Sequence, residues 1–434
     1  MAKFTFDALD QGNASVAGVT IYDGEHTPLK LGAEQQLGRT GASGSVYELP
    51  GRSDFCVKIY RPEDLADKGK RAQIVSCLRA MINMPGCARN RSLAWPLGTV
   101  HDKSGSAIGY AMRRIPKGAT TFKSLFGGAA AVSRYFPKWG RRELAITAMN
   151  FVDMLRYLEG YGVRPGDFNP ENFLVDENCN VMFIDCDSFS FRDRNGNVHT
   201  NGMFFPDCAA PEILRGPNIA DQPRTLQQTC FSAAVLSFML IMTGQHPYTF
   251  AGEALDGTTT GSPAENVLAG KCPLGHGAGC KQDPRWYALW SWLPASLQCA
   301  FIATFRDGHS NPAMRTTLLD LSAELGKFKH VCEIVPERNA LSPAAPKPRG
   351  SAMRTPAGVP PSCGAYPQVA TGCPGNQMPS RQYAPRPRTP YDGQPYPYYS
   401  RPNFPRQHGG YGRGYNSQVN NGFNRSYRPF GLGH

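Results

Sequence analysis

The segment Gly166–Asp187 constrains the fold of this chain more than any other, because it combines strongly apolar runs with three regularly spaced polar residues. Asp167 is followed by Asn172 after five residues and by Asp185 after a further thirteen, and the runs FLV and VMFI lie between Asn172 and Asp185. A solvated loop needs no apolar flanks, and a plain core strand carries no acids. We therefore interpret FLV and VMFI as short strands that support a site made by the three polar side chains.

Composition divides the 434-residue chain at Val335. The segment Pro336–His434 has 12 Lys and Arg against two acids, 18 of the 37 prolines and none of the five tryptophans. Such a segment buries too little apolar surface to offset the entropy of ordering its chain, so we expect a disordered tail. The preceding residues are nearly neutral and predict a globular body of two lobes or two domains.

The sequence predicts no membrane attachment. The opening residues MAKFTFDALDQG lack the apolar core of a secretion signal, and the apolar run Phe231–Met242 is too short to cross a bilayer. We interpret that run as a buried helix. The 13 cysteines contain no CxxC pair, so we expect a cytoplasmic protein with reduced thiols.

Local patterns predict an α+β fold with a β-rich first part and a helix-rich second part. Residues 17–60 are rich in Val, Ile and Tyr between Gly- and Ser-containing turns, as in short strands. Helices are expected over 62–84, over 141–158 and in most of the chain after 226, and a strand pair around 93–100 and 107–115.

A glycine-rich turn and a lysine precede the opening motif. The stretch LGRTGASGSV contains Gly38, Gly41 and Gly44 and ends at Val46, and Lys58 follows Gly44 by fourteen residues on the next expected strand. Glycines let backbone amides approach phosphates closely, and a lysine in that place puts a positive charge on the α- and β-phosphates of a nucleotide.

The three polar residues of the opening motif suit phosphoryl transfer. Asp167 is placed to accept the proton of an attacking hydroxyl. Asn172 and Asp185 offer the oxygen ligands that Mg²⁺ prefers.

In this order, the motifs resemble the protein-kinase superfamily over residues 30–320. The sequence motifs VRPGDFNPENFLVD, FIDCDSF and VKIY are similar to those of the bacterial kinase-like proteins of the tellurite-resistance-associated (TerY-type) phosphorylation systems. By resemblance, Lys58 is the phosphate-binding lysine, Asp167 the catalytic base, and Asn172 and Asp185 the metal ligands. Glu212, in Ala-Pro-Glu, matches a structural glutamate whose expected partner is Arg315.

The resemblance implies a two-lobed protein-kinase-like fold that binds ATP with Mg²⁺ or Mn²⁺ between the lobes. The implied activity is transfer of the γ-phosphoryl group to Ser or Thr hydroxyls of a protein substrate. Implied partners are a PP2C-type phosphatase and a von Willebrand A-domain protein. The expected division is an N-terminal strand segment, a kinase small lobe, a kinase large lobe and the tail, at 1–29, 30–118, 119–335 and 336–434.

Several positions depart from the kinase pattern. Gly166 replaces the arginine that reads a phosphorylated activation segment, so we expect no activation by phosphorylation there. Asn169 replaces a lysine that faces the transferring phosphoryl group. The stretch Asp185–Asp187, DCD, lacks the usual phenylalanine, and Thr229 stands where an acid opens the central helix. No clear glutamate is available to pair with Lys58.

Gln73 lies at a plausible distance along the chain for that missing partner, and Glu63 is too close to Lys58. These departures leave a nucleotide-binding pseudokinase scaffold open as an alternative, with nucleotidyl transfer as a further one. The tail offers another: its interleaved Arg and Tyr suit weak binding of nucleic acid or of a partner. The cysteines and histidine of CPLGHGAGC, at 272–280, supply three ligands without standard zinc spacing, so we expect a loop.

Overall fold

A computed structural model of the chain describes most of residues 35–345 together with three N-terminal strands. The described residues are 4–6, 19–22, 28–31, 35–38, 41, 43–49, 53–102, 106–200, 202–216, 222–252, 254, 257, 261–275 and 279–345. All of them belong to one compact unit. Of the expected tail only 336–345 are described, so the prediction of disorder for 346–434 lies outside the described residues.

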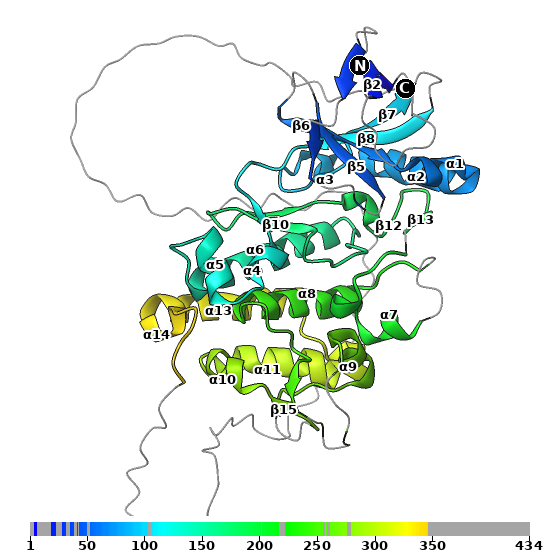
Figure 1. The fold of residues 1–434 in the computed structure, drawn as a ribbon. Coiled ribbons are helices and arrows are strands. Elements are labelled where there is room, and N and C mark those ends of the chain that lie inside the picture. Colours follow the sequence, from blue (N-terminus) through cyan, green and yellow to red (C-terminus); the bar gives the residue numbers. More distant parts are fainter. Residues whose placement is uncertain are drawn as a thin grey trace, which may run out of the picture. The chain divides into compact units, whose positions relative to one another are not determined.

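The first part of the chain forms an eight-stranded sheet (Figure 1). Neighbouring strands run antiparallel except for one parallel pair, which joins β1 to β7. In sheet order the strands are β3 (Pro28–Leu31), β2 (Val19–Tyr22), β1 (Phe4–Phe6), β7 (Gly98–Asp102), β8 (Ala107–Arg113), β6 (Phe55–Tyr60), β5 (Gly44–Glu48) and β4 (Gln36–Leu37).

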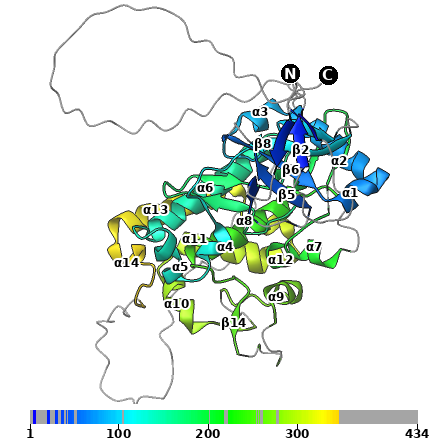
Figure 2. The same cartoon turned by 45° about the horizontal axis from the view of Figure 1, so that its top comes forward.

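Three short helices follow β6: α1 (Pro62–Ala66), α2 (Lys68–Ile82) and α3 (Pro85–Arg89). The single helix expected over 62–84 is divided at Asp67, whose backbone is extended and whose side chain accepts a hydrogen bond from the Lys70 amide. Asp67 thus caps α2. Leu65 and Leu78 pack into the core of the sheet, beside which α1 and α2 lie in Figure 2.

From Thr120 onward the chain is mainly helical. The helices α6 (Arg141–Glu159), α8 (Leu226–Ile241) and α13 (Leu318–Ile334) lie side by side in both views (Figures 1 and 2). α6 carries an apolar stripe, as its sequence predicts, whereas α8 is buried on nearly all sides. The α+β class with a sheet-rich first part and a helical second part is therefore confirmed.

Smaller elements surround these three helices. The short strands form a three-stranded sheet of β9 (Thr120–Thr121), β10 (Phe173–Val175) and β11 (Val181–Phe183), and two pairs, β12 (Phe191–Arg192) with β13 (Val198–His199) and β14 (Phe250–Ala251) with β15 (Lys281–Gln282). The remaining helices are α4 (Phe122–Leu125), α5 (Ala129–Tyr135), α7 (Pro211–Arg215), α9 (Pro263–Ala269), α10 (Pro284–Ser291), α11 (Ala295–Ile302), α12 (Gly308–Ser310) and α14 (Pro336–Asn339). A π-helix (Ala303–Asp307) and 3₁₀ turns at Cys186–Ser188, Pro206–Cys208 and Pro312–Met314 complete the described elements.

The described chain continues past the expected tail boundary at Val335. α14 begins with a proline, and Asn339 accepts a hydrogen bond from the Arg142 amide at the start of α6. The Trp292 indole donates to the carbonyl of Ala344. These contacts attach residues 336–345 to the helical part. Among the described residues, no helix is both long and apolar enough to cross a bilayer.

The turn after α8 contains a buried histidine. Gly244 has a φ of +100°, and a Cβ atom there would lie 1.9 Å from the Phe126 carbonyl oxygen, so the turn requires glycine. Nε2 of His246 donates to the Asp207 carbonyl at 2.8 Å, and its Nδ1 accepts from the Tyr248 amide. Burial lowers the pKa of His246 to about 4, so the ring is neutral.

We expect stability to fall as pH decreases because of His246. Its folded pKa lies below the unfolded value of 6.5, so the unfolded chain binds the extra proton first. The free energy of unfolding should fall by up to about 3 kcal/mol between pH 6.5 and 4 from this residue. Urea unfolding at several pH values measures it. His246→Gln should flatten the slope and exposed His330→Gln should not; equal slopes in all three proteins would contradict the assignment.

Candidate active site

Lys58 lies on β6, an inner strand of the eight-stranded sheet. On β6 it is paired with Val46 of β5 on one side and with Tyr110 of β8 on the other. Its side chain is buried, and its Nζ atom contacts two carboxylates from the segment after β11, Asp185 and Asp187. The distances from Nζ to the two oxygens of Asp187 are 2.9 and 3.0 Å. The buried positive charge of Lys58 is thus paired with two negative charges, which offsets the cost of removing it from water.

Asp187 is held by two tyrosines as well as by Lys58. The Tyr60 hydroxyl donates to its Oδ2 at 2.9 Å, and the Tyr110 hydroxyl donates to its Oδ1 at 2.8 Å. Burial alone would raise the pKa of Asp187, but Lys58 and the two hydroxyls lower it below its usual value. Burial, reinforced by Asp187, raises the pKa of both tyrosines, which remain donors.

The same carboxylates keep Lys58 charged. Burial works against the charged amine, yet Asp187 and Asp185 raise its pKa above the usual value. The Nζ atom also lies 5.7 Å from the ring centre of Tyr60 and 5.9 Å from that of Tyr110. Lys58, Tyr60, Tyr110 and Asp187 form a closed polar group, which we call the lysine cluster.

Asp167 lies in the loop between α6 and β10. It is 8% exposed, its Oδ1 accepts from the Asn169 amide, and its Oδ2 accepts from the Asn172 side chain at 3.3 Å. Burial, with a further contribution from Asp185, raises the pKa of Asp167. A carboxylate of raised pKa is a better proton acceptor than an ordinary one.

The strands β10 and β11 bring the two expected metal ligands together. Phe173 lies opposite Phe183, so Asn172 just before β10 meets the residues just after β11, and the Ile184 amide donates to the Asn172 carbonyl. Asp185 follows with φ 55° and ψ 37°, the left-handed conformation that few non-glycine residues adopt. FLV and VMFI therefore form a hairpin whose open end carries Asn172 and Asp185.

The pKa of Asp185 is shifted in the opposite direction to that of Asp187. Burial and the charge of Asp187 raise its pKa, and Lys58 opposes this without cancelling it. The carboxylates of Asp167, Asp185 and Asp187 thus lie in one region, and Lys58 contacts the latter two. A divalent cation beside Asp185 and Asn172 would relieve the remaining repulsion, and oxygen ligands suit magnesium. The side chains present therefore fit such a metal.

The glycine-rich turn connects β4 to β5. Gly38 has a φ of +72°, and the Gly41 amide donates to the Gly44 carbonyl at 2.8 Å. At Gly44 a Cβ atom would lie 2.1 Å from the Ile59 carbonyl oxygen, so only glycine fits against β6 there. Gly44 and Val46 thus stand on the strand next to Lys58.

α2, the helix of the sheet-rich part that follows Lys58, does not supply an acidic partner for this lysine. Gln73 is exposed, and α2 carries no acidic residue. The position of Gln73, which lies at a plausible distance along the chain, therefore provides no partner, and Lys58 contacts Asp187 instead. Sequence reasoning missed Asp187, although the second acid of DCD was its available signal.

Arg224 is a second residue that sequence reasoning missed. It is 5% exposed, donates to the carbonyls of Gly166 and Met203, and gives its amide hydrogen to the Ser190 hydroxyl. It thus ties the Asp167 loop to the segment after β13. Thr229, expected at the position of an acid, bonds only to the Thr225 carbonyl of its own helix among the described contacts.

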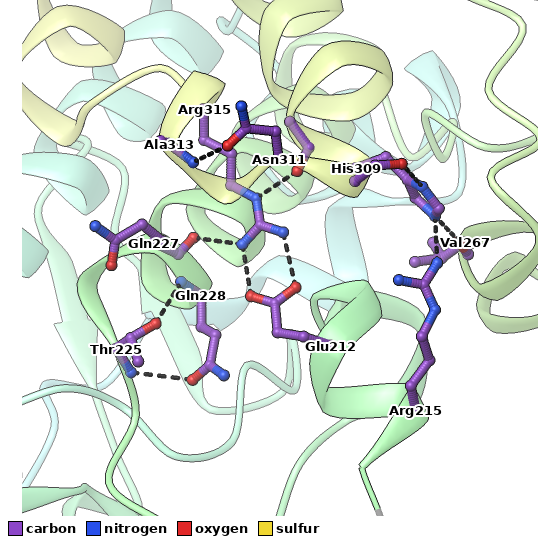
Figure 3. Close-up of polar contacts among 12 residues, drawn as sticks. Glu212, Arg215, Thr225, Gln227, Gln228, Val267, His309, Asn311, Ala313 and Arg315 are labelled. Atoms are coloured by element: carbon purple, nitrogen blue, oxygen red, sulfur yellow. Dashed lines mark hydrogen bonds and ion pairs between the residues drawn. The ribbon is translucent and has the colours of Figure 1, made fainter.

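Glu212 and Arg315 form an ion pair in the helical part (Figure 3). Both guanidinium NH groups contact the carboxylate at 2.7 Å, and the Arg315 side chain is 1% exposed. Arg315 also donates to the carbonyls of Gly308 and Gln227. The pair holds α7 against the segment before α13. Burial alone would raise the pKa of Glu212, but the charge and hydrogen bonds of Arg315 lower it below its usual value.

The CPLGHGAGC stretch shows no zinc site in the part of the chain that is described. Cys272 and Cys280 are buried free thiols, and His276 lies outside the described residues. Burial raises the pKa of Cys272 to about 12, which disfavours the thiolate that zinc requires. Among the described residues, no three or more His, Cys, Asp or Glu side chains come together as a group that could hold a metal ion.

The structure combines a buried lysine on a sheet, a buried aspartate in the loop between α6 and β10, and a hairpin that bears Asn172 and Asp185, and this arrangement is consistent with a kinase-like fold. No protein-family model matches the chain. It is 26% identical over 281 residues to "Protein kinase YegI" of Escherichia coli strain K12, and 26% identical over 285 residues to that protein of strain O157:H7. Each match covers 63% of this chain and 41% of the relative. The similarity supports a protein-kinase-like family, although the chain spans about two fifths of the length of these relatives.

Arg315→Lys should destabilise the helical part. Lysine cannot keep both contacts to Glu212 and the two carbonyl contacts, so a partly buried carboxylate and the carbonyls lose hydrogen-bond donors. We expect a loss of about 3 kcal/mol in the free energy of unfolding, measured by urea denaturation. Arg306→Lys, at an exposed arginine, is the control and should change stability little. Equal midpoints for the two variants would contradict a structural role for the pair.

Proposed function

We propose that this chain is an ATP-dependent protein kinase that transfers the γ-phosphoryl group to Ser or Thr hydroxyls of a protein substrate. The observation that carries the proposal is the meeting of Lys58, Asp167, Asn172 and Asp185 from separate elements in one polar region. Similarity to proteins named as kinases supports the same conclusion.

Each side chain has a distinct task in the proposed reaction. Asp167 accepts the proton of the acceptor hydroxyl, whose oxygen bonds to the γ-phosphorus as the bond to the β-phosphate oxygen breaks and ADP leaves. Lys58 neutralises charge on the phosphates, and Asn172 with Asp185 would hold Mg²⁺ or Mn²⁺. The metal, when bound, supplies further charge neutralisation. The backbone of Gly38, Gly41, Gly44 and Val46 would cover the nucleotide.

The proposed enzyme does not depend on phosphorylation of its activation segment, the residues between Asp185 and Glu212. Gly166 offers no side chain to read a phosphate, and Arg224 already joins the Gly166 and Met203 carbonyls. Ser188 and Ser190, the serines of that segment, are 3% and 1% exposed. Their burial supports ordinary structural roles.

A nucleotide-binding scaffold is the second candidate. Asn169 in place of the loop lysine favours it, since a cation beside the transferring group is then missing. The PP2C-type phosphatase, the von Willebrand A-domain protein and a tail-bound partner or nucleic acid remain proposals from the resemblance and the tail composition. Cytoplasmic location also remains a proposal.

Phosphoryl transfer is tested with ATP labelled at the γ-phosphate, Mg²⁺ or Mn²⁺, and casein as acceptor. We expect transfer by the wild type and a loss of about a hundredfold or more in Asp167→Ala and Asp185→Ala. Exposed Glu177→Gln, on the β10–β11 turn, is the control and should keep full activity.

No transfer by the wild type would contradict the kinase proposal. If nucleotide then still raises the melting temperature and Lys58→Ala abolishes that shift, the scaffold is supported. Equal transfer by wild type and Asp167→Ala would also exclude the assigned base.

A further inference from the structure

We propose that Asp187 is the positioning residue for Lys58, so that the metal-binding turn, and not a helix of the sheet-rich part, sets the lysine for catalysis. This inference rests on the proposed function, because it assigns Lys58 to the nucleotide phosphates. In protein kinases the lysine is paired with a helix glutamate, and movement of that helix controls activity. Here the acid stands two residues after the metal ligand Asp185.

The geometry of the lysine cluster carries the inference. Lys58 Nζ contacts both oxygens of Asp187, and the two tyrosine hydroxyls occupy the remaining positions on that carboxylate. Asp187 therefore has four polar contacts from three side chains, all on β6 and β8. Such a carboxylate is fixed by the sheet itself.

α2 offers nothing comparable on its side. No Asp or Glu occurs among the residues of α2, and Gln73 on this helix is exposed. The titratable side chains that Lys58 contacts are Asp185 and Asp187 at its amine and the rings of Tyr60 and Tyr110. Both acids thus come from one short segment.

This arrangement couples two parts of the proposed site. Asp185 and Asp187 flank Cys186, which is fully buried and starts a 3₁₀ turn, so displacement of one acid displaces the other. The lysine and the metal ligand are consequently set together. Because α2 carries no acid, the lysine–glutamate pairing by which that helix controls activity in protein kinases is not available to Lys58 from α2.

The first experiment measures the titration of Lys58 without nucleotide. Protein labelled with ¹⁵N-lysine gives a side-chain signal that Lys58→Arg identifies. We expect the wild-type amine to stay charged to higher pH than in Asp187→Asn, because the asparagine removes a negative charge. Asp64→Asn, at an acid paired with exposed Lys70, is the matched control and should leave the Lys58 titration unchanged.

The second experiment measures Mg-ATP affinity and transfer rate across pH. Asp187→Asn should weaken Mg-ATP binding about tenfold or more and move the alkaline loss of affinity to lower pH, whereas Gln73→Ala on α2 should stay within about twofold of wild type. Tyr60→Phe and Tyr110→Phe each remove one donor and should give smaller shifts in the same direction. These two tyrosine variants still test the inference if Asp187→Asn does not fold.

The outcomes separate this inference from the proposed function. If wild type neither binds nor uses Mg-ATP, the proposed function fails, and the Lys58 titration alone still decides whether Asp187 holds the lysine. An unchanged Lys58 titration in Asp187→Asn would overturn the inference. So would a Gln73→Ala variant as impaired in Mg-ATP binding as Asp187→Asn.

Discussion

The buried contact between Lys58 and Asp187 is the interaction on which the candidate site depends. A lysine inside a sheet is tolerated only if its charge is paired, and the acid in turn requires donors for its other lone pairs. Tyr60 and Tyr110 supply those donors from β6 and β8. Removal of Asp187 would take the acceptor from both hydroxyls and leave Lys58 with Asp185 as its remaining carboxylate partner, so Asp187 is the member on which the other three depend.

The hairpin of β10 and β11 joins this cluster to the other polar residues. Its apolar strands pack in the core while its open end places Asn172 beside the residues after β11. Asn172 then reaches back to Asp167, and Arg224 ties the loop of Asp167 to the segment beyond β13. The Glu212–Arg315 pair fixes the next stretch of chain. Hydrophobic strands and a few buried charges together thus organise one polar region.

Much of this organisation was predictable from sequence, because order and spacing along the chain carry it. Lys58, Asp167, Asn172, Asp185, Glu212 and Arg315 follow from motif order, and α6 follows from its apolar period. Asp187 and Arg224 do not, since their roles depend on which distant strands and loops approach them. The division of the helix at Asp67 depends on one side chain, which caps α2 by accepting a hydrogen bond from the Lys70 amide. The spacing of apolar residues does not reveal such a cap. The structure of the last 89 residues lies outside the described part.

The most direct test of the account is a crystal structure of the chain with Mg²⁺ and a non-hydrolysable ATP analogue. We expect Lys58 Nζ to lie between the phosphates and Asp187, the metal to bind Asn172 and Asp185, and α2 to make no contact with Lys58. Nucleotide bound away from Lys58, or a lysine that leaves Asp187 for a residue of α2, would contradict it.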